Sequence, residues 1–193
     1  MQNTFYILVL KKIEKKMKKL FFTAMAVLAF GFANAQSQIS KGSWLIEVNT
    51  GFGEKVGNTS IGLWSEDGRT DYNIGAEAGY FVDDKLALKF GLGFGETSFY
   101  DDAFGEYYSA SNFAYKLGLK YYAAGKFPLE ISYNGVNYED LDENPSYLGL
   151  QAGYAIFLNK NVSIEPGIRY NVSLNDDFYD DVFQLNIGFA LHF

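Results

Sequence analysis

Eight charged residues stand inside segments that are otherwise built mainly from apolar residues and glycine. They are Glu47, Glu77, Lys89, Lys116, Lys120, Glu130, Glu165 and Arg169. A buried charge is costly unless it is paired and hydrogen-bonded. Because four of these residues are acidic and four are basic, they predict a salt-bridge network that neutralises itself.

The sequence holds a single histidine, His192, and no cysteine. A hydrolytic triad needs an imidazole beside a nucleophile and an orienting carboxylate. The strand pattern described below places His192 at the end of the molecule away from the long loops, where such a triad is not expected. Zinc-protease, phosphate-loop and dinucleotide motifs are also missing from the sequence. We therefore predict a protein without catalytic residues or cofactors.

One acidic stretch resembles part of a metal-binding loop. Asp140, Asp142 and Asn144 have the spacing of the first ligands in a calcium loop. Pro145 replaces the turn glycine of such a loop, and Gln151 stands where its bidentate glutamate is expected. A metal site at these three residues is therefore one hypothesis, and a crown of solvated, mutually repelling acidic loops is the other.

Alternating segments position the charged residues. Side chains on a strand alternate between its two faces, so an alternation of apolar with small or polar residues predicts strands. Eight such segments are 44–53, 72–82, 86–95, 113–121, 129–134, 148–158, 162–172 and 182–193. Segments of about ten alternating residues are typical of transmembrane β-barrels.

The connections between these segments alternate in length. Short ones are predicted at 82–85, 122–127 and 159–161, and long ones at 54–71, 96–112, 135–147 and 173–181. In an up-and-down barrel every second connection lies at the same end. Short periplasmic turns and long outer loops are the expected arrangement.

The two faces of the predicted strands differ strongly in size and charge. An eight-stranded barrel is only wide enough for side chains to fill it, so the face with glycine and the charges should point inward and the aromatic and aliphatic face should point to lipid. The eight charges, with Gln151, Gln184 and Asn186, should then plug the lumen. The alternatives are a narrow porin-like channel and a soluble, secreted lipocalin-like barrel whose apolar face lines a cavity.

The N-terminal region predicts export. Six lysines between 11 and 19 precede an apolar run at 20–32, and Ala33-Asn34-Ala35 gives the small-x-small cleavage pattern of a secretory signal. Residues 1–35 are therefore interpreted as a cleaved signal peptide and 36–193 as the barrel. Met17 resembles the usual start of such a signal, so 1–16 are interpreted as an upstream extension or a mis-assigned start.

The mature chain is strongly acidic. After removal of 1–35 it has 10 basic and 22 acidic residues, a net charge of −12, which argues against nucleic acid as a partner. It retains no apolar stretch that could form a spanning helix, so strands must cross any membrane.

Several of these motifs resemble a known family. The signal end Ala33-Asn34-Ala35-Gln36, the Gly-x-x-x-Gly-Tyr patterns at 75–80 and 149–154, and the terminal phenylalanine are similar to the small outer-membrane β-barrel domain family, the OmpA/OmpX-like proteins, in a Bacteroidetes-type form. The resemblance implies an all-β, eight-stranded antiparallel barrel and no reaction. It also implies that the barrel-insertion machinery reads the last strand, a role that maps onto Phe189, Leu191 and Phe193.

Together these observations predict a monomeric, non-enzymatic protein of the bacterial outer membrane. Its expected role is structural or surface-interacting. Its expected partners are membrane lipid, lipopolysaccharide, the insertion machinery and an extracellular partner at the acidic loops.

Overall fold

The computed structural model describes residues 38–52, 59–66, 69–101, 106–139 and 143–193. The predicted signal peptide, residues 1–35, lies outside these ranges. Within them, no helix is both long enough and apolar enough to cross a membrane.

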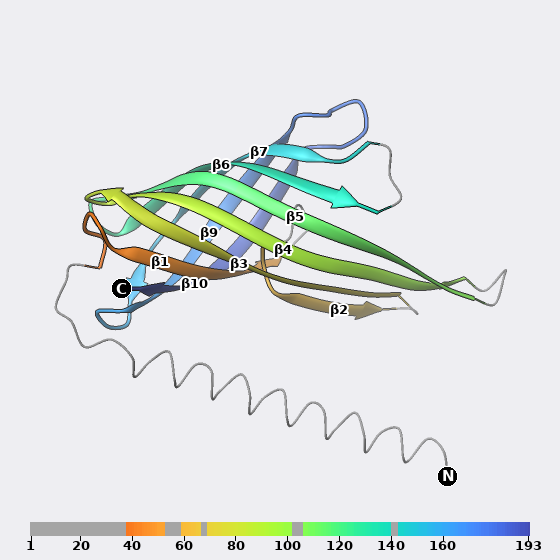
Figure 1. The fold of residues 1–193 in the computed structure, drawn as a ribbon, viewed down its shortest axis with the longest axis horizontal. Coiled ribbons are helices and arrows are strands. Elements are labelled where there is room, and N and C mark those ends of the chain that lie inside the picture. The colour runs from red at the N-terminus through yellow and green to blue at the C-terminus, as the bar shows by residue number, and fades with distance from the viewer. Residues whose placement is uncertain (1–37, 53–58, 67–68, 102–105, 140–142) are drawn as a thin grey trace, which may run out of the picture. The chain divides into compact units, whose positions relative to one another are not determined.

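The described chain consists of antiparallel strands joined by turns and loops (Figure 1). The strands are β1 (Trp44–Phe52), β2 (Gly62–Glu66), β3 (Arg69–Asp83), β4 (Leu86–Asp101), β5 (Glu106–Ala123), β6 (Phe127–Tyr138), β7 (Ser146–Gly153), β8 (Ile156–Phe157), β9 (Val162–Ser173) and β10 (Val182–His192). All eight predicted segments contain a strand.

The sheet closes on itself because β1 pairs with β10 on one side and with β3 on the other. The path around the barrel is β1, β10, β9, β7, β6, β5, β4, β3 and back to β1. The short β8 pairs with β9 in the same register as β7, so β7 and β8 together form one barrel strand. The structure thus confirms the eight-stranded antiparallel up-and-down barrel. We call the end with the β3–β4, β5–β6 and β8–β9 turns the short-turn end, and the other the long-loop end.

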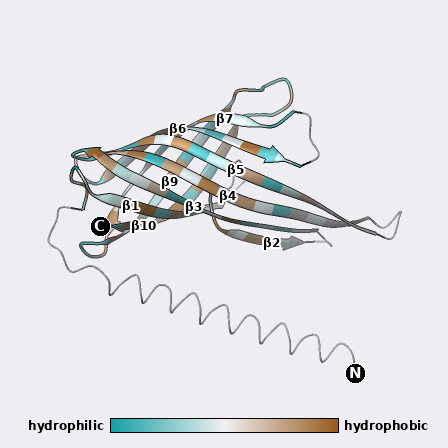
Figure 2. Ribbon diagram, viewed as in Figure 1, coloured by the Kyte–Doolittle hydropathy of each residue, from teal (hydrophilic) through white to brown (hydrophobic). Residues whose placement is uncertain are grey.

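The predicted facing of the side chains is confirmed. Buried and exposed residues alternate along the strands, and many large apolar side chains are among the exposed ones. The alternating colours of Figure 2 show the accompanying alternation of hydropathy. Phe90, Leu117 and Ile168, for example, are 51%, 54% and 51% exposed. Inside, space is short: a Cβ at Gly149 would collide with the guanidinium of Arg169. Glycine therefore lies where neighbouring strands or lumen side chains leave no room for a larger residue.

Two predicted loops were wrong in extent. Residues 96–112 continue β4 and β5 as a paired ladder from Gly95–Asn112 out to Asp101–Glu106. The predicted loop at 54–71 contains β2, which among the described strands pairs with β3 alone. Both extensions lie beyond the alternating apolar region. Backbone pairing can continue where apolar and polar residues do not alternate, so periodicity could not reveal these extensions.

Pro166 faces outward in the middle of β9, a position where proline usually marks a bulge or an edge strand. The register between β7–β8 and β9 is the same on both sides of it, so there is no bulge. Tyr154 donates its N–H to the Pro166 carbonyl over 3.0 Å, and proline has no N–H to return. The Ala155 N–H points to the other side of the strand and donates to the Lys126 carbonyl over 2.7 Å, in continuation of the β6–β7 register. Proline thus removes one hydrogen bond of the ladder with β9 and leaves the register unchanged.

The lumen at the short-turn end also contains large apolar side chains, beside the glycines and charges that were predicted to face inward. Leu45, Phe81 and Tyr122 are fully buried there. They pack with Ala87, Ala155 and Ala190. A small apolar core therefore closes this end of the barrel.

Candidate functional site: the charged lumen

The eight inward charges meet inside the barrel, as the sequence predicted. They project from β1, β3, β4, β5, β6 and β9, and their exposed fractions lie between 0% and 7%. Every one takes part in at least one ion pair of 3.0 Å or less. Alternation brought each residue to the inner face, and closure of the barrel brought the six strands together.

Lys89 on β4 is the centre of this network. Its Nζ lies 2.9 Å from Glu47 Oε2, 2.5 Å from Glu77 Oε2 and 2.8 Å from Glu130 Oε2. Glu47 and Glu77 are direct cross-strand partners on β1 and β3, a placement in which two like charges repel. The shared ammonium group converts this repulsion into two attractive pairs.

Two further lysines extend the network along β5. Lys116 and Lys120 are four residues apart, so both face inward at different heights. Lys116 Nζ lies 2.9 Å from Glu77 Oε1 and 2.7 Å from Glu130 Oε1, and Lys120 Nζ lies 2.5 Å from Glu47 Oε2 and 2.6 Å from Glu165 Oε2. Each of the three lysines therefore bridges at least two carboxylates, and the network has no net charge.

Arg169 completes the network toward the long-loop end. A guanidinium has five N–H donors in a fixed fork, and Arg169 makes five hydrogen bonds with them. Nε donates to Asn171 Oδ1 (2.8 Å), Nη1 to Glu130 Oε1 (3.0 Å) and Gln151 Oε1 (3.0 Å), and Nη2 to Ser132 Oγ (2.5 Å) and Asn134 Oδ1 (3.1 Å). Because all five N–H groups of the guanidinium have acceptors, the Arg169 side chain is held across the lumen.

The three amide residues that were expected to join the network differ in the hydrogen bonds that they make. Gln151 accepts from Arg169, and Gln184 Oε1 accepts from Asn171 Nδ2 over 2.9 Å. Asn186 is buried, but its Oδ1 has no hydrogen-bond partner among the described residues. Sequence reasoning did not single out Ser132, Asn134 or Asn171, although all three face inward by parity.

His192 lies at the short-turn end of the lumen, in a hydrogen-bonded chain. Its Nε2 is 2.9 Å from Ser163 Oγ, which donates to Glu165 Oε1 over 2.8 Å. The Tyr122 hydroxyl donates to the same carboxylate oxygen over 2.9 Å. In a hydrolytic triad the imidazole stands between serine and carboxylate. Here the serine stands between the other two, so the arrangement does not activate a nucleophile.

Tyr122 is a site residue that the sequence reasoning missed. It was assigned to the predicted turn at 122–127, but it is the last inward residue of β5 before that turn. The available signal was parity, since Gly118, Lys120 and Tyr122 take every second place. Its ring also lies 5.3 Å from the Lys120 ammonium, within the range of a cation–π contact.

The segment before β1 closes the short-turn end of the barrel. We call residues 38–43 the strap. The Gln38 carbonyl lies 3.1 Å from His192 Nδ1, and the Ile39 carbonyl accepts from the Lys85 N–H over 2.7 Å. Ile39 packs against the apolar core of that end. The sequence held no pattern that predicted this segment's position, because its contacts join residues far apart in the chain.

Thr59 enters the lumen from the long-loop end, opposite the strap. It is 6% exposed and donates from Oγ1 to Glu77 Oε1 over 2.6 Å. The β1–β3 ladder has only four residue pairs and ends at Glu47–Glu77. Beyond that point Ser60 bridges to Asn49 of β1 and the Ile61 N–H donates to the Asn49 carbonyl, so residues 59–61 continue the seam. The position of Thr59 in the lumen was not predicted from the sequence.

The metal site at Asp140, Asp142 and Asn144 stays a prediction. Asp140 and Asp142 lie outside the described residues. Asn144 Oδ1 accepts the Tyr138 N–H over 2.8 Å and so helps to shape the β6–β7 loop. Across the described part of the chain, no group of three or more His, Asp or Glu side chains is arranged to hold a metal ion.

The residues of the predicted assembly signal lie in β10 and, for Phe193, directly after it. Phe189 pairs with Val48 of β1 and Ile164 of β9. Phe193 exchanges two backbone hydrogen bonds with Trp44, of 3.0 Å and 2.6 Å. Phe189 and Phe193 are 42% and 39% exposed on the outer surface. Their recognition by the insertion machinery stays a prediction.

Comparison with known proteins gives similarity at the level of the fold. No protein-family model matches the sequence, and no curated protein sequence matches it significantly. The structure is similar to the outer membrane protein OprG from Pseudomonas aeruginosa, with a TM-score of 0.46, 15% identity, and coverage of 82% of this chain and 99% of that one. It is also similar to the Yersinia pestis outer membrane protein Ail, with a TM-score of 0.45, 14% identity, and coverage of 79% of this chain and 100% of that one. A de novo designed transmembrane β-barrel is similar as well, with a TM-score of 0.45, 16% identity, and coverage of 80% of this chain and 98% of that one.

Proposed function

We propose that this chain is a non-enzymatic outer-membrane β-barrel protein of the OmpA/OmpX-like, Bacteroidetes-type group. It serves a structural or surface-interacting role, and its lumen is closed to solutes. The observation that carries the proposal is the neutral network of eight buried charges, which occupies the space a pore would need.

The outer surface supports a membrane location. Large apolar side chains such as Phe94, Leu150 and Leu185 are exposed all around the barrel. Exposed apolar patches of that extent mark a surface that something apolar covers. A soluble lipocalin-like barrel would hold this face inside, around a ligand cavity. The observed facing is the reverse, so that alternative is set aside.

The closed lumen separates the proposal from a porin-like channel. Ions crossing the barrel would have to displace Lys89 and Arg169, which between them engage three carboxylates and four other side chains. We expect the purified protein to give no steady conductance in planar bilayers. Removing both cations, in Lys89→Ala/Arg169→Ala, should give measurable current if that variant inserts. Steady current from the unmodified protein would favour the narrow channel instead.

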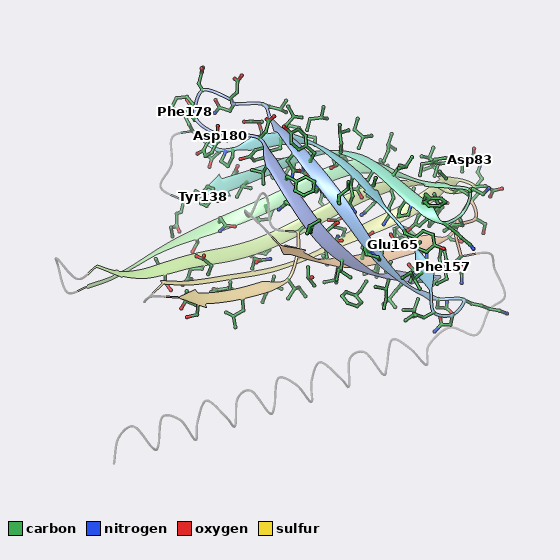
Figure 3. All side chains as sticks on the ribbon, turned by 180° about the vertical axis from the view of Figure 1, so that it is seen from behind. Asp83, Tyr138, Phe157, Glu165, Phe178 and Asp180 are labelled. Carbon is green, nitrogen blue, oxygen red and sulfur yellow. The ribbon has the colours of Figure 1, made fainter. Side chains whose placement is uncertain are left out.

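The distribution of exposed charge supports one orientation in the membrane. The exposed lysines of the described chain lie at the short-turn end, namely Lys41, Lys85, Lys126 and Lys160. Exposed carboxylates gather in the described loops of the other end, at Glu139, Glu143, Asp176, Asp177, Asp180 and Asp181. In Figure 3, Tyr138, Phe178 and Asp180 accordingly lie at the end opposite Asp83 and Phe157. The acidic end would face outward, where divalent cations could link it to lipopolysaccharide phosphates.

A single-cysteine experiment tests location and orientation together. The chain has no cysteine, so Asp176→Cys and Lys160→Cys each introduce one unique thiol. On intact cells a membrane-impermeant maleimide should label Asp176→Cys but not Lys160→Cys, and both proteins should fractionate with the outer membrane. Labelling in the opposite pattern, or recovery in a soluble fraction, would refute the proposal.

A further inference from the structure

The loop between β9 and β10, residues 174–181, exposes an aromatic ring in an acidic setting. Phe178 is 64% exposed, the highest value for any large apolar side chain outside the strands in the described chain. Leu174 in the same loop is 53% exposed. Ile74 and Phe94 are similarly exposed, but they lie on strands whose outward faces form the apolar band. Phe178 lies beyond the ends of β9 and β10 at the long-loop end (Figure 3).

The loop is held in place by its own hydrogen bonds. The N–H groups of Phe178 and Tyr179 both donate to the Asn175 carbonyl, over 3.1 Å and 3.0 Å. The carboxylate of Asp181 accepts the Ser173 N–H and the Tyr170 hydroxyl, each over 2.8 Å. These two donors hold the pKa of Asp181 below its usual value. The backbone on both sides of Phe178 is therefore anchored.

The loop is also attached to its neighbours. The Tyr179 hydroxyl donates to the Glu143 carbonyl over 2.8 Å, and its ring packs against Tyr147 and Val182. The Leu174 N–H donates to the Ser146 carbonyl over 2.9 Å. Tyr179 thus turns inward as the adjacent Phe178 turns outward. A binding group that is ordered in advance loses less conformational entropy when a partner binds.

The charges around the ring decide what could cover it. Asp176, Asp177 and Asp180 are exposed and lie within two residues of Phe178, and no lysine or arginine follows Arg169 in the sequence. Without a bridging divalent cation, phosphate groups of lipid or lipopolysaccharide would be repelled by these carboxylates. A metal ion could bind them but would leave the ring in water. The combination suits a partner that offers both an apolar pocket and positive charge.

We propose that this loop is a docking site for a cationic, amphipathic polypeptide segment, with Phe178 as the apolar anchor and Asp176, Asp177 and Asp180 as the groups that attract lysine or arginine. The inference rests on the proposed function, because the loop must face the exterior. Aromatic anchors in the centre of an interface carry much of its affinity, and complementary charges mainly raise the association rate and the specificity.

The test uses the full barrel in nanodiscs of zwitterionic lipid and a fluorescent, helix-forming peptide of leucine and lysine, with empty nanodiscs subtracted. The unmodified protein should bind the peptide. Phe178→Ala should weaken binding about tenfold. The triple variant Asp176→Asn/Asp177→Asn/Asp180→Asn should weaken binding and remove most of its dependence on salt concentration.

Matched controls are placed at the opposite end of the barrel. Leu158→Ala removes an apolar side chain that is 59% exposed at the short-turn end, and Asp83→Asn/Asp84→Asn removes two carboxylates there. Both should bind the peptide like the unmodified protein. A peptide of leucine and glutamate should not bind at all.

The outcomes separate this inference from the proposed function. If Asp176→Cys is labelled on intact cells but Phe178→Ala binds as tightly as the unmodified protein, the docking site is refuted and the outward orientation stands. If the lysine peptide does not bind the unmodified protein, the docking site is refuted as well. If Asp176→Cys is not labelled from outside, both proposals fail together.

Discussion

Glu47 and Glu77 face each other as the last residue pair of the β1–β3 seam, and the ammonium group of Lys89 contacts both carboxylates. The two carboxylates thus lie at the end of the four-pair β1–β3 ladder, and the lysine that contacts both comes from β4. Buried ion pairs are often no better for stability than apolar packing, but removing one partner is costly. The network therefore makes closure of this seam depend on Lys89.

Lys89→Met should destabilise the barrel strongly. It leaves three buried carboxylates without their shared cation, and removal of one partner from a buried pair costs about 3–5 kcal/mol. The unfolding midpoint in detergent, followed by heat-dependent gel migration, should fall. Lys160→Met, at an exposed turn position, is the control and should not change the midpoint. An unchanged midpoint for Lys89→Met would show that the network is not structurally important.

Gly149→Ala should displace Arg169, because the added methyl group would occupy the position of its guanidinium. Overpacking of this kind typically costs about 1–3 kcal/mol. The penalty should shrink in an Arg169→Met background, where the fork is absent, and a double-mutant cycle of unfolding free energies measures this coupling. Equal penalties in both backgrounds would mean that the two positions do not interact.

His192→Phe should loosen the strap. The new ring can pack against Phe81, Tyr122 and Phe157 as the imidazole does, but it cannot bond to the Gln38 carbonyl or to Ser163. Hydrogen exchange at the Lys41 and Gly42 amides should accelerate, while amides in the middle of β4 keep their protection. Unchanged exchange in the strap would assign its closure to the remaining contacts, namely Ile39 packing and the strap's backbone hydrogen bonds.

The β9–β10 loop should keep its order in moderately acidic solution. The pKa of Asp181 lies below its usual value because its charged form accepts the Ser173 N–H and the Tyr170 hydroxyl. The stabilisation is therefore fully present above the usual aspartate pKa and is lost only as the pH falls through the lowered value. Protection of the Ser173 amide reports this, and Asp181→Asn should reduce that protection at neutral pH. Loss of protection well above the usual aspartate pKa would contradict the assignment.

Deletion of Phe193 should impair membrane insertion but not export. The residue ends the last strand and exchanges two hydrogen bonds with Trp44, at the place where β10 meets β1. The amount of folded barrel in the outer-membrane fraction should drop, with unfolded protein accumulating in the periplasm. Phe183→Ala, at the other end of β10, is the control and should assemble normally. A normal yield after the deletion would refute the assembly signal.

The sequence by itself determined the strands and the facing of their side chains. A strand has a period of two whatever surrounds it, so Glu47, Lys89 and Arg169 could be assigned to the lumen from their neighbours alone. The balance of four acids and four bases then predicted a network. In the β4–β5 extension apolar and polar residues do not alternate in this way, and there the prediction stopped short.

Only the tertiary structure decided which acid meets which base and what else enters the lumen. The height of a side chain inside a barrel depends on the stagger between strands, which is set by closure of the whole sheet. That is why Lys89 could be placed on the inner face but not between Glu47 and Glu77. Thr59 and Gln38 reach the lumen through contacts between residues distant in the chain, and no local period records such contacts.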